Sequence, residues 1–374
     1  MKFGLFYQIQ VPKPWTEESE ARRIWEALDQ IAYAEEVGYD SVWFSEHHFR
    51  PEWSHNSAPD LTLAAVSQRT SRIRMGVGVV LAPIHHPLHT ASRMATLDIL
   101  SRGRVDVGIG RTGYPYQLTP YGSGLKDTRG MWEEYAQVLP KIWTEEVVTH
   151  EGQYFQIPPR EVLPKPLQKP HPPLWSACAS EETTRLAGEM GLGALVGSEG
   201  GPEKGADVLE LYNRTVKASR HEGIHVNHQN ALMTAGYCHE SSKVVEERGT
   251  ELVAWYLNQQ RERARLVWRG VDPATVPPDY QGYYERDQHL AAGPPPGDPT
   301  PADVVRQGTK FCVGTPDDCI KFYETYEAMG VEQVFLLCAI GPAANEEVMN
   351  TIRLFGKYVI PHFKAKEKTQ AAVV

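Results

Sequence analysis

The sequence alternates short apolar runs with longer amphipathic segments over most of its length. The apolar runs are rich in β-branched and aromatic residues, which favours buried strands. The segments between them are long enough for helices, so the pattern predicts parallel strands joined by right-handed helical crossovers. About eight strand–helix units predict an α/β fold of the (β/α)8 TIM-barrel type rather than an open doubly wound sheet. The expected strands are residues 3–7, 41–45, 74–81, 103–110, 174–177, 193–197, 231–238 and 331–338.

Two stretches interrupt this alternation. Residues 152–158 predict a hairpin excursion, and residues 158–173 contain seven prolines and predict a connecting segment. Residues 268–311 contain many prolines, tyrosines and charged residues without periodicity. A loop of this length in a compact domain is usually a lid or binding loop, or else disordered. We therefore expect one barrel domain over residues 1–374, with an insertion or lid at about 268–311 before the eighth strand.

Charge and cysteine content narrow the functional classes. The formal net charge is -9 and no basic patch stands out, which argues against nucleic-acid binding. No apolar stretch is long enough to span a bilayer, and the N-terminal apolar run is too short for a signal peptide. The five cysteines include no CxxC pair, so neither a disulfide framework nor a zinc site is expected. These features predict a cytoplasmic protein.

A first candidate site follows the second expected strand, where the apolar run ends in Glu46, His47 and His48. Active sites of (β/α)8 barrels lie at the carboxyl ends of the strands, and histidine titrates near neutral pH. The three residues are therefore candidates for proton transfer or for polarising a cofactor or substrate. A metal site is disfavoured because two adjacent histidines on a strand point to opposite sides. Position alone fits equally well with histidines that are hydrogen-bonded within a loop.

Two glycines lie inside the third expected strand. Gly76 and Gly78 weaken a strand, and glycines there often mark the close approach of a ligand or of another backbone. Tight packing inside the barrel explains them at least as well.

An arginine follows the fourth expected strand in a glycine-rich setting. Arg111 suits an anion such as a phosphate, which a guanidinium can hold with two hydrogen bonds. Gly108, Gly110 and Gly113 have the spacing of a dinucleotide fingerprint, but loop residues 114–124 follow instead of the required helix. We therefore reject a dinucleotide site.

The helix after the fifth expected strand begins at Ser180, a favourable N-cap residue. Free backbone N–H groups at a helix start form an anion site. Plain capping is the alternative, with Glu181 and Glu182 complementing the helix dipole. Those two carboxylates would repel a phosphate unless they point outward.

Several motifs occur together in a specific order. They are Met1-Lys2-Phe3-Gly4, Gly38-Tyr39-Asp40-Ser41-Val42-Trp43, Glu46-His47-His48-Phe49, His86-Pro87, Ser101-Arg102-Gly103-Arg104, Gly108-Ile109-Gly110-Arg111, Val313-Gly314-Thr315-Pro316 with Cys319-Ile320, Leu354-Phe355 and Pro361-His362-Phe363. In order and spacing, over nearly the whole chain, they resemble the bacterial luciferase family of flavin-dependent monooxygenases, in particular the catalytic alpha subunit. The family fold is a (β/α)8 barrel, in agreement with the pattern of strands and helices.

The resemblance implies a function and its cofactors. Reduced FMN would be delivered by a separate NAD(P)H-dependent flavin reductase, and its reaction with O2 would give a flavin 4a-peroxide. This peroxide would oxidise a small organic substrate by hydroxylation, epoxidation or Baeyer–Villiger insertion. The resemblance also implies a dimer, which we expect to be a homodimer. Two alternatives are a deazaflavin-dependent hydride transferase and a non-catalytic flavin-binding subunit.

The resemblance also assigns residues. His47 is the acid/base candidate, His48 supports the flavin peroxide or the substrate, and residues 268–311 match the mobile lid. Gly78 and Val79 match a non-prolyl cis peptide under the flavin, and the phosphate positions match Arg111, Ser180 and Thr183. The expected catalytic residues are Glu46, His47 and His48, the expected cofactor-binding residues are Gly78, Val79, Gly110, Arg111, Ser180, Glu181 and Thr183, and no metal is expected.

The sequence departs from the family pattern at positions beside the flavin. Gly110 stands where luciferases carry a reactive cysteine, and Ala339 stands in place of an acid near the end of the eighth strand. Glu181 and Glu182 replace smaller residues beside the phosphate. These changes argue against light emission and a long-chain aldehyde substrate. Gly110 is further expected to enlarge the pocket for a bulkier substrate.

Overall fold

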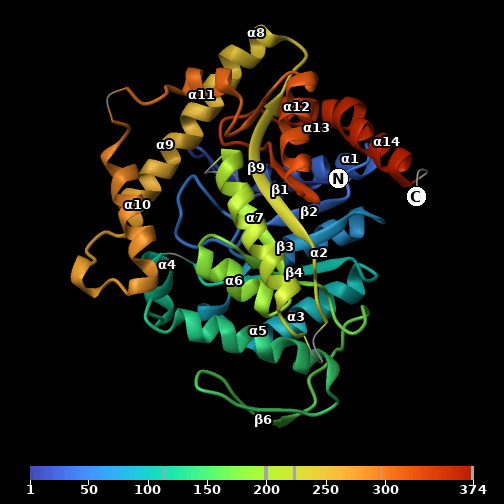
Figure 1. Cartoon of the computed structure of the whole chain (residues 1–374), viewed down its shortest axis with the longest axis vertical. Helices are drawn as coiled ribbons and strands as arrows, with labels where there is room; N and C mark the ends of the chain where they lie inside the picture. The colour runs from blue at the N-terminus through green and yellow to red at the C-terminus, as the bar shows by residue number, and fades with distance from the viewer. Residues whose placement is uncertain (113, 198–200, 222–224, 296, 372–374) are drawn as a thin grey trace.

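Eight parallel strands close into a barrel in a computed structural model that describes residues 1–112, 114–197, 201–221, 225–295 and 297–371 (Figure 1). The order around the barrel is β1-β2-β3-β4-β7-β8-β9-β11, and β11 pairs with β1 to close it. These strands are β1 (Lys2–Tyr7), β2 (Ser41–Phe44), β3 (Arg74–Leu81), β4 (Val105–Gly110), β7 (Leu174–Ala177), β8 (Gly193–Gly197), β9 (Asn230–Cys238) and β11 (Gln333–Leu337). The predicted (β/α)8 barrel is confirmed.

Helices connect the strands and surround the barrel. The main ones are α1 (Ser19–Glu36), α2 (Pro59–Arg69), α3 (Pro87–Leu100), α5 (Thr128–Thr144), α6 (Glu181–Glu189), α7 (Gly201–Ala218), α9 (Thr250–Val267), α12 (Pro316–Ala328), α13 (Asn345–Leu354) and α14 (Ile360–Ala371). Short helical turns α4 (Pro115–Leu118) and α8 (Ser242–Val244) precede α5 and α9. No helix within the described residues is both long enough and apolar enough to cross a bilayer.

Two smaller strand elements extend this frame. The predicted hairpin is present as β5 (Val148–Glu151) paired antiparallel with β6 (Gln156–Arg160). A short strand, β10 (Cys312–Gly314), pairs in parallel with the end of β9 and was not expected from the sequence.

The segment at 268–311 differs from the loop that its sequence predicts. It contains helices α10 (Gln281–Ala292) and α11 (Pro301–Gln307), which lie beside α9 at one side of the barrel (Figure 1). The segment has a small core of its own with the end of α9, formed by Val267, Trp268, Val276 and Tyr280. Its aromatic residues supply this core, and they are spaced too irregularly for a helical pattern to be seen in advance.

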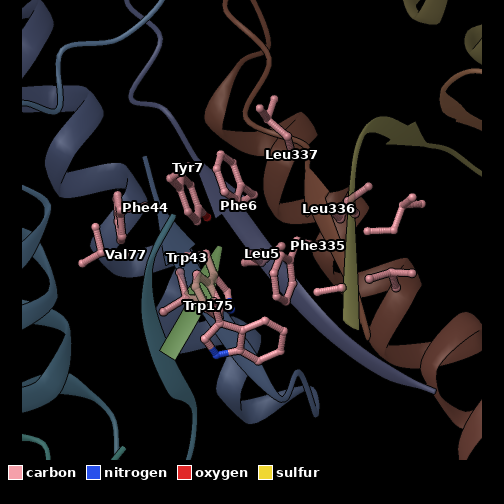
Figure 2. Close-up of a cluster of buried hydrophobic side chains, with 14 of the residues drawn as sticks. Leu5, Phe6, Tyr7, Trp43, Phe44, Val77, Trp175, Phe335, Leu336 and Leu337 are labelled. Atoms are coloured by element: carbon pink, nitrogen blue, oxygen red, sulfur yellow. The ribbon is translucent and has the colours of Figure 1, made fainter. Parts of the chain in front are cut away.

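Large aromatic side chains fill the barrel interior (Figure 2). Trp43 on β2 stacks on Phe335 of β11 with ring centroids 4.9 Å apart, and meets Trp175 of β7 edge to face at 5.5 Å. A Cβ atom on Gly76 would overlap the indole of Trp43. Tight packing inside the barrel therefore explains Gly76. This was one of the two interpretations of the glycines in this strand.

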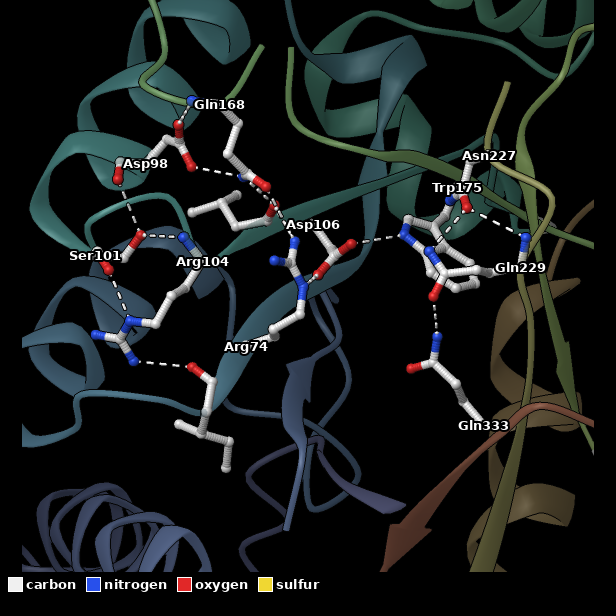
Figure 3. A network of polar contacts seen from close by, with 12 residues as sticks. Arg74, Asp98, Ser101, Arg104, Asp106, Gln168, Trp175, Asn227, Gln229 and Gln333 are labelled. Carbon is white, nitrogen blue, oxygen red and sulfur yellow. Dashed lines mark hydrogen bonds and ion pairs between the residues drawn. The ribbon is translucent and has the colours of Figure 1, made fainter. Parts of the chain in front are cut away.

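A polar network ties the strands together at their amino ends (Figure 3). Arg104, just before β4, donates to the carbonyl oxygens of Ser67, Ile73 and Ser101 at 2.7 to 3.0 Å. Asp106 accepts from Arg74 at 2.7 Å and from the indole of Trp175 at 3.1 Å. The Ser101–Arg104 motif is therefore a structural element at the end of the barrel opposite the carboxyl ends of the strands.

Candidate active site

A cavity of about 320 Å³ lies at the carboxyl ends of the barrel strands. Its described walls come from the strand ends, from the loops after β2 and β4, from α9, and from Tyr280 and α10 of the segment at 268–311. Of the residues predicted for the site, the cavity is lined by Glu46, His47, Gly78, Val79, Gly110, Arg111 and Thr183. His48, Ser180 and Glu181 are not among the described lining residues.

Glu46 organises the polar side of the cavity. Its carboxylate is buried, and one oxygen accepts from Nε2 of His48 at 2.8 Å and from Nε2 of His85 at 2.6 Å. The other oxygen accepts from the backbone N–H of Leu81 at 3.1 Å. Burial alone would raise the pKa of Glu46, but the hydrogen bonds from the two histidines hold this pKa below its ordinary value. Glu46 is therefore a fixed anion that orients both rings.

His48 is not among the described lining residues and is held in this network. Its Nδ1 atom is 2.8 Å from the hydroxyl of Tyr121, while its Nε2 atom bonds to Glu46. The backbone N–H of His48 donates to the side chain of Gln117 at 3.1 Å. In the described structure His48 is thus a histidine satisfied within a loop network, which was the alternative interpretation.

Glu46, His48 and His85 also place three potential metal ligands within 4.8 Å of one another. The argument from adjacent histidines assumed that they lie on a strand, but β2 ends at Phe44 and both histidines lie in the loop after it. The argument also did not consider His85, which follows the end of β3. Both histidine nitrogens lie at hydrogen-bond distance from the same carboxylate oxygen, which explains the cluster without an ion.

His47 lines the cavity, and its Nδ1 atom is buried without a hydrogen-bond partner. Burial lowers the pKa of His47 well below its ordinary value of 6.5, and the charge of Arg50 lowers it further. The imidazole is therefore neutral at pH 7, and a neutral imidazole can accept a proton from a ligand in the cavity.

Gly78 and Val79 form the floor beside His47. The peptide bond between them is cis, as the resemblance implies. The expectation that Gly110 enlarges the pocket is wrong, because the side chain of Val79 fills the space beside it. A Cβ atom on Gly110 would overlap the Cγ2 atom of Val79 and lie 3.9 Å from the Cβ atom of Ala177.

Arg111 lies at the exit of β4 and is only 8% exposed. Its guanidinium stacks over the ring of Tyr280 at 4.9 Å, and its Nη1 atom is 2.5 Å from a carboxylate oxygen of Asp279. The same oxygen is 3.3 Å from Arg129, at the start of α5. Nη1 of Arg129 is buried and has no hydrogen-bond partner. Two guanidinium groups therefore converge where the sequence predicted a phosphate.

The start of α6 borders these arginines. The hydroxyl of Ser180 caps the helix by accepting from the backbone N–H of Thr183 at 3.3 Å, and it lies 2.9 Å from the Thr183 hydroxyl. Glu181 and Glu182 are exposed, and Glu182 forms an ion pair with Arg129 at 2.7 Å. Glu182 thus pairs with one of the two converging arginines, so the condition that both carboxylates point away from an anion site is not met at Glu182.

The sequence did not reveal several residues that the fold brings to the site. Arg129 had one indication, since a cation in the first turn of a helix opposes the helix dipole. Asp279 lies in a segment without periodicity, and His85 contacts Glu46 only because β2 and β3 are neighbours. Gly113 lies outside the described residues.

The fold and the cavity define a (β/α)8 barrel protein with a cavity at the carboxyl ends of its strands, where the active sites of such barrels lie. Residues 1–333 match the family of luciferase-like monooxygenases, and the chain belongs to this family.

Relatives and solved structures extend this result. The chain is 25% identical to the alkanal monooxygenase alpha chain of Photorhabdus luminescens, covering 98% of both proteins. It is 28% identical to the oxygenase component of flavin-dependent trigonelline monooxygenase from Acinetobacter baylyi, covering 52% of this chain and 54% of the relative.

Among solved structures, the monooxygenase RslO1 of Streptomyces bottropensis superposes with a TM-score of 0.78 at 26% identity, covering 97% of this chain and 100% of that one. An F420-dependent secondary alcohol dehydrogenase shares the fold with a TM-score of 0.69 at 19% identity, covering 96% and 98%.

Proposed function

We propose that this protein is a monooxygenase that uses reduced FMN and O2 to oxidise a small organic substrate. The observation that carries the proposal is one cavity that joins two elements. A neutral histidine, His47, lines the cavity together with Gly78 and Val79, and Arg111 lines it as well. Arg111 shares a carboxylate oxygen of Asp279 with Arg129, which is not among the described lining residues.

The residues present fit FMN. Arg111 and Arg129 would supply two guanidinium groups for the phosphate. Nη1 of Arg129 is buried without a hydrogen-bond partner, and a phosphate oxygen could accept from it. Thr183 and the N–H groups at the start of α6 would add neutral donors, with Ser180 holding the helix end. Gly78 and Val79, which line the cavity, would lie against the ring system.

Reduced FMN, when bound, supplies the electrons that activate O2 for transfer of one oxygen atom to the substrate. The protein binds, orients and protects the reactants. His47 accepts or returns a proton at its ring nitrogen, and Glu46 fixes the histidine network behind it. Tyr280, Tyr283 and Arg286 of the lid segment cover the cavity and exclude water from it.

Oxygen uptake decides between this function and its alternatives. With reduced FMN supplied by a separate NAD(P)H-dependent reductase, a substrate screen should give oxygen consumption coupled to a product that is heavier by one oxygen atom. The F420-dependent enzyme of the same fold gives the deazaflavin alternative its basis. Substrate oxidation that consumes F420 and no oxygen would establish that alternative, and decay of reduced flavin without product would favour a non-catalytic subunit.

The partners follow from the same proposal. The trigonelline relative is named as an oxygenase component, which supports a separate flavin reductase as partner for this chain. We also propose a homodimer. Sedimentation of the purified chain tests the assembly, and flavin transfer from a purified reductase tests the partnership.

Asp279 should act against FMN binding. A phosphate that reaches Arg111 must displace or approach the Asp279 carboxylate, which lies 2.5 Å from the guanidinium. Replacing Asp279 with asparagine removes this competing ion pair from Arg111 and should tighten FMN binding by about fivefold to tenfold. Fluorescence titration with FMN and with riboflavin measures the effect, which should be confined to FMN.

Glu285→Gln provides the control for that variant. It also removes one negative charge from the lid segment, but Glu285 is exposed and does not line the cavity. Equal tightening in both variants would mean that only the net charge of the lid matters, and that Asp279 has no special position.

A further inference from the structure

Four uncharged side chains in the cavity wall carry a buried polar atom that has no hydrogen-bond partner among the described residues. These atoms are Nδ1 of His47, Nε1 of Trp53, Nε1 of Trp132 and Oγ of Ser176. A buried polar atom without a partner is unfavourable, and most such atoms in proteins are paired. The four atoms therefore indicate where polar groups of ligands bind.

The order of the strands divides these atoms into two groups. Ser176 lies on β7, which pairs with β4, and Trp132 lies on α5 close to Arg129. This group belongs to the side of the cavity where the phosphate anchor of FMN is proposed. His47 and Trp53 both lie between β2 and α2, and β3 separates β2 from β4 in the barrel. These two residues are thus left for a second ligand.

The segment between β2 and α2 is a closed turn that holds His47 and Trp53 in one wall. The backbone N–H of His47 donates to the carbonyl oxygen of Asn56 at 3.2 Å. Inside this turn the backbone N–H of Ser54 donates to the carbonyl oxygen of Arg50 at 3.1 Å, and the two residues form an antiparallel bridge. Trp53 is only 5% exposed. Both ring systems are therefore fixed by the same backbone.

The two unpaired atoms have opposite hydrogen-bonding roles. The indole N–H of Trp53 can only donate. Burial lowers the pKa of His47, and a hydrogen bond with the side chain of Gln117 opposes this effect. A partner that raises the pKa of a histidine accepts a ring proton, and Nδ1 has no partner, so Nδ1 is the nitrogen with the free lone pair. One donor and one acceptor on the same turn match a hydroxyl group, which accepts and donates at a single oxygen.

The wall next to this turn is aromatic and apolar. Phe6 of β1 and Phe335 of β11 line the cavity, and β1 lies between β11 and β2 in the barrel. A Cβ atom on Gly78 would lie 3.2 Å from the ring of Phe6, so this ring borders the floor of the cavity. Aromatic faces of this kind suit a flat apolar body.

From these observations we infer that the substrate is a phenol, whose hydroxyl donates to Nδ1 of His47 and accepts from Nε1 of Trp53. Its ring lies against Phe6 and Phe335. In the proposed oxygenation one atom of O2 enters a ring C–H bond, and the other leaves as water with the two electrons and two protons of reduced FMN. The inference rests on the proposed function for the word substrate, but the hydroxyl site itself can be tested without turnover.

The probes p-cresol and p-xylene differ by one hydroxyl in place of a methyl group of similar size. Equilibrium dialysis of the full chain loaded with oxidised FMN at pH 7.5 should give about tenfold tighter binding of p-cresol. 4-Methylbenzaldehyde, which can only accept, should bind less tightly than p-cresol. Trp53→Phe keeps an aromatic ring without the N–H, and it should reduce the preference for p-cresol, as should His47→Ala. Trp25→Phe is the matched control, because Trp25 is exposed on α1 and is not among the described lining residues.

Several outcomes would overturn the inference. Equal binding of p-cresol and p-xylene by the wild-type chain would exclude a hydroxyl site, and a preference for the aldehyde would indicate a carbonyl substrate. The inference is also wrong if both variants keep the preference, or if p-cresol displaces FMN. Unchanged thermal midpoints show that the variants are folded, and the wild-type comparison decides even if one of them is not. Failure of the oxygenase proposal would appear in oxygen uptake and not in these titrations.

Discussion

Replacing His47 with alanine should lower substrate turnover by about 10²- to 10⁴-fold, the usual contribution of a positioned acid or base. FMN affinity should remain nearly normal, because the proposed phosphate anchor lies at Arg111 and Arg129, two strands away in the barrel order. Turnover is measured with a substrate found by the oxygen-uptake screen, and FMN affinity by fluorescence titration. An unchanged rate would exclude the acid/base role of His47.

The pH dependence provides an independent readout of the same residue. Burial lowers the pKa of His47, so the imidazole stays neutral at pH values below the ordinary histidine range. The wild-type rate should therefore be constant from pH 8 down through 6.5 and fall only under more acidic conditions, where His47 is protonated. The remaining activity of His47→Ala should lack this acidic decline.

His228→Ala is the control for both measurements. His228 is exposed before the amino end of β9, on the face of the barrel opposite the cavity. It should leave the rate, its pH profile and FMN binding unchanged. A similar loss of rate in this variant would indicate a general effect on stability instead of a role in proton transfer.

The barrel could be predicted because its strands are buried on both faces. Runs such as Val42–Phe44 and Phe335–Leu337 have almost no polar residues, so they stand out against the helices between them. The segment at 268–311 lacks such contrast. Tyr280, just before α10, and Tyr283 and Tyr284 on that helix belong to a cluster with Tyr114 and Leu125, which lie far away in the sequence, so no local pattern indicates these partners.

Only those candidate site residues that directly follow a recognisable strand could be predicted. His47 and Arg111 follow recognisable strands, so their places on the catalytic face could be derived from the barrel alone. Their partners could not be predicted, because His85 follows a neighbouring strand and Asp279 belongs to the segment at 268–311. The error at Gly110 has the same origin, since removing a side chain enlarges a cavity only if no neighbour fills the space, and Val79 does.

Arg111→Ala should weaken FMN binding by about ten- to a hundredfold and leave riboflavin binding almost unchanged. A hydrogen bond from a charged group contributes about 1.5–3 kcal/mol, and each 1.4 kcal/mol corresponds to a factor of ten in the dissociation constant. Riboflavin lacks the phosphate, so removing the guanidinium of Arg111 removes no hydrogen bond to it. Parallel fluorescence titrations with the two flavins measure the difference directly.

The carboxylate of Asp279 allows a more specific test of Arg111 with a double variant. Arg111 is paired with Asp279 and lies over the ring of Tyr280, so the guanidinium is already oriented and one carboxylate oxygen occupies part of its donor edge. Arg111→Ala combined with Asp279→Asn should therefore lose the tightening that Asp279→Asn gives alone, because without the guanidinium there is less to uncover. Additive effects of the two substitutions would mean that Asp279 acts on the phosphate independently of Arg111. Equal losses for FMN and riboflavin in Arg111→Ala would instead remove Arg111 from the phosphate site altogether.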